Sequence, residues 1–157
     1  MAKRLTGEQL KPFHNFMKDY IRRYTSLDAA RVDEIWAEDA HCIGTGPDEW
    51  YVTRKQLEAG IRRDFSELDS VQMEYDRLEA FAASDHACLS CQVKVAFVPR
   101  GEQKADHMPP LRFTLFLVME QGGWKIQHIH ASGALNSQPQ GRSFPEAERT
   151  FPEGEGV

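Results

Sequence analysis

The sequence predicts an α+β fold, in which three N-terminal helices pack on one face of a strongly curved antiparallel sheet. In the first 70 residues apolar side chains recur at steps of three and four, and after Asp69 they alternate with polar ones. The length of 157 residues suits one domain, and a composition that is 41% hydrophobic and 27% charged suits a chain with a sizeable core.

Each predicted helix begins at a capping residue followed by an apolar stripe. Thr6 opens the first helix, whose stripe is Leu10, Phe13, Met17, Tyr20 and Tyr24. Asp28 opens a short second helix, whose stripe is Ala29, Val32, Ile35 and Trp36. Thr53 opens the third, with Leu57, Ile61, Phe65 and Leu68 toward the core and Glu58, Arg62, Arg63 and Asp64 outside.

Four long strands are predicted after the helices, at residues 71–81, 87–98, 111–121 and 124–134. From Asn136 onward the composition shifts to Pro, Gly, Ser and Glu without periodicity, so we expect one domain at 1–135 and a tail at 136–157. The two Phe-Pro-Glu repeats in this tail leave two alternatives open. They either dock as apolar anchors or belong to a loosely held segment.

Charge and hydropathy argue against several classes of partner. The chain has 19 basic and 24 acidic residues, a formal net charge of −5, so it has no basic footprint for nucleic acid or an anionic membrane. The longest apolar run, at residues 115–119, is far shorter than a membrane span, and no apolar stretch follows Met1. Three cysteines do not make a disulfide framework, and we therefore expect a cytoplasmic protein.

The last two strands place two histidines on the inner face if Gln121 and Gly122 form a two-residue turn. In that register Met119 faces Trp124, Leu117 faces Ile126, Leu115 faces His128, and Phe113 faces His130. His128 and His130 are then candidates for catalytic proton transfer in a partly dry cavity. The alternatives are core histidines satisfied by hydrogen bonds, or a metal pair. No companion carboxylate stands at a fixed spacing, so neither a metal nor a cofactor is predicted.

The same alternation assigns an outer face and a cavity wall. Phe116, Val118 and Ile129 are predicted to lie outside and to join two copies of the chain as a homodimer. Trp124 is predicted to pack under the first or second helix. The residues expected to line the cavity and bind a small, largely apolar metabolite are Tyr24, Trp36, Trp50, Phe65 and Phe113, with Arg112 included if a bulge re-aims it.

The closing segment, residues 121–134 with the sequence Gln-Gly-Gly-Trp-Lys-Ile-Gln-His-Ile-His-Ala-Ser-Gly-Ala, resembles a known hairpin. It is similar to that of the calcium/calmodulin-dependent protein kinase II association domain and of its bacterial SnoaL-like relatives, in the nuclear transport factor 2-like superfamily. The stretches 85–89, 112–114 and 44–49 extend the resemblance, which covers residues 10–135. It implies a cone-shaped α+β barrel with a pocket between helices and sheet, usually dimeric through the convex sheet face.

The resemblance leaves two functions open, because the superfamily includes isomerases, dehydratases and polyketide cyclases as well as non-catalytic association domains. The pocket arginines of the kinase domain fall on Val93, Leu115 and Ala131 here, which argues against an acidic ligand. An acid–base mechanism of the steroid isomerase type needs a pocket aspartate. The predicted inner face contains no clear carboxylate, and the pattern does not place Asp39, Asp64 and Asp76. The chain is expected to be either an enzyme with a pocket histidine or a binding or association module.

Overall fold

A computed structural model of the chain describes residues 1–136, 138, 140 and 141. The helical elements are the 3-10 helix η1 (Gly7–Leu10), α1 (Lys11–Tyr24), α2 (Ala29–Asp33) and α3 (Arg54–Ser66). The strands are β1 (Lys3–Arg4), β2 (Trp36–Ile43), β3 (Trp50–Tyr51), β4 (Leu68–Ala82), β5 (His86–Pro99), β6 (Asp106–His107), β7 (Leu111–Glu120) and β8 (Gly123–Gly133). The Phe-Pro-Glu repeats lie outside the described residues.

The strands form one sheet in the order β1-β4-β5-β7-β8-β2-β3, with β6 paired to β5. The predicted α+β fold is confirmed, and so are the four long strands. The sheet is mixed rather than wholly antiparallel, because β2 runs parallel to β8. This parallel pair was missed because Trp36 was assigned to the second helix, whereas it begins β2.

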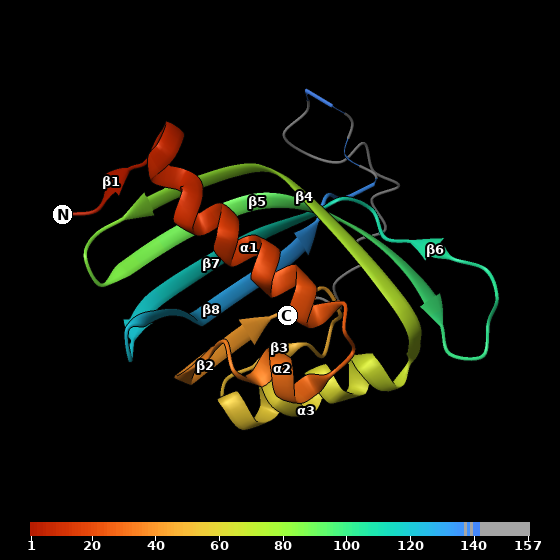
Figure 1. The fold of residues 1–157 in the computed structure, drawn as a ribbon. Helices are drawn as coiled ribbons and strands as arrows, with labels where there is room; N and C mark the ends of the chain where they lie inside the picture. Colours follow the sequence, from red (N-terminus) through yellow and green to blue (C-terminus); the bar gives the residue numbers. More distant parts are fainter. Residues whose placement is uncertain (137, 139, 142–157) are drawn as a thin grey trace, which may run out of the picture.

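The helices cover one face of the curved sheet, as Figure 1 shows. Helix α1 crosses that face diagonally, and α3 lies below it, beside the lower end of β4. The core between them is apolar, and its fully buried large side chains are Met17, Val32, Leu57, Leu89, Val93, Leu115, Leu117 and Ile126. The helices therefore bury their apolar stripes on the sheet and leave their polar faces outside.

Local sequence explains where the helices begin. The carboxylate of Asp28 accepts a hydrogen bond from the Ala30 N–H at 3.1 Å. The hydroxyl of Thr53 accepts one from the Gln56 N–H at 3.3 Å. Both satisfy amides that have no partner inside the helix, so the predicted starts of α2 and α3 are confirmed.

The hairpin between β7 and β8 turns at the predicted residues. Gln121 and Gly122 both have positive φ, 51° and 79°, as a two-residue primed turn requires. The predicted pairs next to the turn, Met119 with Trp124 and Leu117 with Ile126, are confirmed. The Trp124 ring lies 5.6 Å from that of Phe13 in α1, so the predicted packing under the first helix is also confirmed.

The outer face of the sheet combines apolar and polar side chains. Phe116 and Val118 of β7 alternate with buried inner residues and lie on this face, but Ile129 does not, since it is only 4% exposed. The surface predicted for a homodimer is therefore corrected to Phe116 and Val118 without Ile129. Dimerisation through it stays a prediction.

We expect Phe116→Glu to weaken any such dimer, because the contact would strand a carboxylate away from water. Light scattering at micromolar concentration measures the effect. A wild-type protein that is monomeric there, or a variant that dimerises as strongly as wild type, contradicts the predicted interface. Thr114→Ser, a mild change on the same face, is the matched control.

Candidate functional site

A cavity of about 270 Å³ lies where the C-terminal part of α1, α3 and the curved sheet fail to close completely. Its walls are mostly aromatic and aliphatic, with side chains from α1, α3, β2, β4, β5, β7 and β8. Polar groups enter it mainly from α3 and from the segment before β3, including Asp64 and Glu49. A concave apolar site with a few polar groups is typical of a site for a small molecule.

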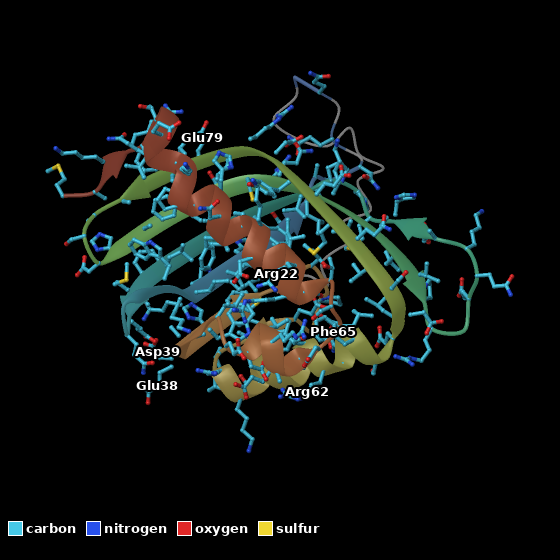
Figure 2. The ribbon with its side chains drawn as sticks, in the orientation of Figure 1. Arg22, Glu38, Asp39, Arg62, Phe65 and Glu79 are labelled. Atoms are coloured by element: carbon cyan, nitrogen blue, oxygen red, sulfur yellow. The ribbon has the colours of Figure 1, made fainter. Side chains whose placement is uncertain are left out.

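The predicted lining is partly correct. Tyr24, Trp36 and Phe113 lie in the cavity wall. Phe65 is buried behind the wall, with its ring 5.0 Å from that of Tyr24, and Figure 2 shows it between α3 and the end of α1. Trp50 is 68% exposed and lies outside the wall.

Arg112 also lies outside the cavity wall. It is an exposed residue between two buried neighbours on β7. The bulge that would have turned it inward does not occur at this position, because residues 111–116 keep a regular register with β8. Arg112 therefore points away from the cavity.

The inner-face position predicted for the two histidines is wrong. Phe116, rather than Leu115, pairs with His128, and Thr114, rather than Phe113, pairs with His130. The register shifts between Leu117 and Phe116, where Gln127 is the extra residue of a β-bulge. Because side chains alternate along a strand, this one residue moves both histidines to the outer face and puts Ile129 and Ala131 in the cavity wall.

On the outer face the His128 ring packs against that of His41, with centroids 4.3 Å apart and ring planes tilted by 32°. Burial lowers the pKa of His128, and the neighbouring His41 lowers it further. His130 is exposed. Neither histidine lines the cavity, so a molecule inside it would have to exchange protons with another group.

Asp64, which was predicted to lie on the outer side of the third helix, is a candidate for that group. It is partly buried and lines the cavity. The spacing along the sequence already indicates this inward position, because Asp64 stands three residues after Ile61 and four before Leu68, in the middle of the apolar stripe. A carboxyl group at a stripe position is unusual enough to mark a functional candidate.

The surroundings of Asp64 act on its pKa in both directions. Burial raises its pKa to about 6, and the negative charge of Glu49 raises it as well. The Tyr24 hydroxyl donates a hydrogen bond to Asp64 Oδ2 at 3.2 Å and acts in the opposite direction, because it stabilises the carboxylate. Asp64 is thus placed to change its protonation state near neutral pH.

Glu49, the second carboxylate of the cavity, is held in place by several donors. Its Oε2 accepts a hydrogen bond from the Gly46 N–H at 2.8 Å, and its Oε1 accepts one from Arg63 at 3.1 Å. Arg63 also donates to Asp48 at 2.6 Å and to the Tyr51 hydroxyl at 3.0 Å. The negative charge of Glu49 is therefore compensated by the guanidinium group of Arg63.

Asp64 lacks such a cation within the described part of the chain, where its hydrogen-bond partner is the neutral Tyr24. The nearby Arg63 lowers the pKa of Asp64 through its charge, without a hydrogen bond to it. A third carboxylate of the lining, Glu67, is exposed to solvent. Of the two partly buried ones, Asp64 is thus the one available to a bound molecule.

We expect Tyr24→Phe to raise the pKa of Asp64 further, because it removes the hydrogen bond that stabilises the carboxylate. A titration of the Asp64 carboxyl carbon by NMR measures the shift. Tyr75→Phe is the control, since the Tyr75 hydroxyl bonds to His14 at 2.9 Å, outside the cavity wall. An unchanged or lower midpoint in Tyr24→Phe contradicts this role.

Asp64 also makes stability depend on pH. Its pKa in the folded chain is about 6, above the ordinary 3.8, so between these values the folded state binds more protons than the unfolded state. Its contribution to the free energy of unfolding is therefore lost as pH rises through this window. We expect Asp64→Asn to be more stable than wild type by about 1 to 2 kcal/mol at pH 8, after allowing for solvent screening, and by much less at pH 4. Urea unfolding at both values tests it, and equal or lower stability at pH 8 contradicts it.

Among the residues that the structure describes, no group of three or more His, Cys, Asp or Glu side chains is arranged to hold a metal ion. No helix among the same residues is long and apolar enough to cross a membrane.

The helices, the curved sheet and the cavity between them define an α+β protein of the nuclear transport factor 2-like class. The chain belongs to the SnoaL-like domain family, which matches residues 14–136. The resemblance of its closing hairpin to SnoaL-like proteins is thereby confirmed. A search of curated proteins found no match.

Solved structures share the fold at low sequence identity. A proposed calcium/calmodulin-dependent protein kinase II association domain from Xanthomonas campestris has a TM-score of 0.73 and 15% identity, over 83% of this chain and 91% of that one. A proposed scytalone dehydratase from Novosphingobium aromaticivorans has a TM-score of 0.71 and 12% identity, over 80% of this chain and 84% of that one. A proposed NTF2-like dehydratase from Streptomyces avermitilis has a TM-score of 0.70 and 14% identity, over 80% of this chain and 96% of that one. At these identities the likeness shows the fold alone.

Proposed function

We propose that this chain is an acid–base enzyme, in which Asp64 takes a proton from a small, largely apolar substrate in the cavity and returns it. The observation that carries the proposal is the place of Asp64. It is a partly buried carboxyl group in an apolar cavity, and its hydrogen-bond partner is the neutral Tyr24.

The physical environment favours proton transfer over a structural role. A carboxyl group that only stabilised the fold would be expected to bond a cation or several amides, as Glu49 does. Asp64 instead has a pKa raised to about 6 by burial and by the charge of Glu49. A general base is most effective when its pKa lies near the working pH, so that it is ionised and still basic.

The simplest reaction for this arrangement is proton abstraction next to a carbonyl group. The Asp64 carboxylate forms an O–H bond as the substrate C–H bond breaks, and the electron pair of that bond moves through the adjacent carbon to the carbonyl oxygen. An enolate results. Return of the proton to another carbon is an isomerisation. Its transfer to a hydroxyl group that leaves as water is a dehydration.

The comparisons give modest support to this class of reaction. Two of the similar structures are described as proposed dehydratases. A third is described as a proposed kinase association domain. The chemistry at Asp64 therefore has to be tested directly.

The test uses 1-tetralone, an uncharged two-ring ketone, in deuterated buffer. We expect the wild-type protein to exchange the C2 hydrogens for deuterium faster than buffer alone, as followed by proton NMR. Asp64→Asn should bind the ketone and lose the exchange. A wild-type protein that binds 1-tetralone without catalysing exchange, or an Asp64→Asn variant as active as wild type, contradicts the proposal and favours a binding module.

A further inference from the structure

The polar side of the cavity carries negative charge. Its lining includes the carboxylates of Glu49, Asp64 and Glu67, and the described lining contains no lysine, arginine or histidine. Arg63 is close by, but it lies outside the lining and bonds to Asp48 and Glu49. The cavity therefore attracts a cation and repels an anion.

Glu67 is the carboxylate of this group whose charge is not paired. Its side chain has no hydrogen bond or ion pair among the residues that the structure describes. Arg100 approaches this end of α3, but its guanidinium group donates to backbone carbonyls between Phe65 and Leu68. The carboxylate of Glu67 is thus available to a charged group on a bound molecule.

Glu67 also marks the mouth of the cavity. Among the described lining residues, Thr45 and Glu67 alone are exposed. Glu67 follows α3 where the chain enters β4 (Figure 1), three residues after the partly buried Asp64. An ammonium group beside Glu67 would keep part of its hydration, so binding there costs less than burial of the charge inside. Asp64 would remain free for proton transfer.

The walls and the size of the cavity suit flat apolar rings behind this charge. The walls include Trp36, Phe97 and Phe113, and aromatic faces attract both other rings and ammonium groups. A cavity of roughly 150 Å³ can hold benzene, and this one has about 270 Å³. One or two rings therefore fit inside while a charged substituent stays at the mouth.

We infer that the ligand of this cavity is a one- or two-ring compound with an ammonium group, which Glu67 binds at the mouth, and that carboxylates are excluded. This inference rests on the proposed function, because both concern the same cavity. It adds the charge of the substrate and a binding residue that is separate from the proton carrier Asp64.

The experiment compares three probes that differ in charge at one position of the same two-ring frame. They are 2-aminotetralin, whose amine is protonated at pH 8, the uncharged 2-tetralol, and tetralin-2-carboxylate. Binding is followed at pH 8 through the methyl signals of methionine, because Met73 and Met108 line the cavity. Met1 and Met119 are exposed and serve as internal controls.

We expect 2-aminotetralin to bind about threefold to tenfold more tightly than 2-tetralol, the combined effect of one exposed ion pair and one cation–π contact. Tetralin-2-carboxylate should bind at least about threefold more weakly than 2-tetralol, because of charge repulsion. Glu67→Gln should at least halve the preference for the amine, since the amide keeps the shape and loses the charge. Glu74→Gln, the same change at an exposed position of β4 outside the cavity wall, should keep the full preference.

Three results would overturn the inference: an amine that binds no more tightly than 2-tetralol, an unchanged preference in Glu67→Gln, or a carboxylate that binds as tightly as the alcohol. The proposed function survives any of them if 1-tetralone still undergoes exchange that depends on Asp64. A preference for the amine that depends on Glu67, without exchange of 1-tetralone, supports the inference and contradicts the proposed function. If neither these probes nor 1-tetralone shifts the Met73 and Met108 signals, both fail.

Discussion

Asp64→Asn should lower the rate of hydrogen exchange in 1-tetralone by about 10²- to 10⁴-fold, the usual contribution of a general base. The amide has nearly the shape of the carboxylate and keeps an oxygen that can accept the Tyr24 hydrogen bond. It cannot take a proton at neutral pH. The rate constant for exchange should therefore fall while the affinity for the ketone changes little, and saturation curves followed by NMR separate the two.

The control is Asp76→Asn, which makes the same chemical change at an exposed position outside the cavity wall. It should leave the exchange rate unchanged. In the wild type the rate should rise as pH increases through about 6 and then level off, because only the ionised form of Asp64 accepts a proton. A rate that falls over this range, or equal losses in the two variants, contradicts the assignment.

Met17→Ala should cause the largest loss of stability, about 2 to 5 kcal/mol in the free energy of unfolding. Met17 is completely buried at the centre of the α1 stripe, four residues after Phe13 and three before Tyr20. Truncation removes its contacts with the sheet and leaves a space that a packed core fills only in part. Urea unfolding of the variant and the wild type measures the difference.

Lys18→Ala is the matched control on the exposed side of the same helix, and it should change stability by less than about 0.5 kcal/mol. Met17 is not part of the cavity wall, so a Met17→Ala protein that remains folded should still bind 1-tetralone. A loss below about 0.5 kcal/mol for Met17→Ala would mean that α1 does not pack on the sheet as described.

The sequence predicted most of the fold because local rules and the tertiary structure agree. Thr53 and Asp28 cap helices whose apolar stripes face the sheet. Gln121 and Gly122 form the turn that their residue types favour. Trp36 was misassigned because a short apolar run fits helix and strand equally well, and only pairing with β8 decides between them.

The site was harder to predict, for two physical reasons. The bulge at Gln127 adds one residue to β8, which reverses the faces of His128 and His130, and nothing in the local sequence requires it. Asp64 was overlooked because a charged residue on a helix is usually solvated. Its spacing to Ile61 and Leu68 indicates a position on the apolar side of the helix. Only the cavity, however, explains why a carboxyl group lies there.

The titration of the Asp64 carboxyl group tests the central claim most directly. Carbon-13 NMR of protein labelled at aspartate can follow it, with the signal assigned by its loss in Asp64→Asn. A carboxyl group that carries protons in an apolar cavity should titrate at about 6, well above the ordinary 3.8. A midpoint at or below 3.8 would mean that Asp64 is solvated or bonded to a cation and cannot serve as the acid–base group.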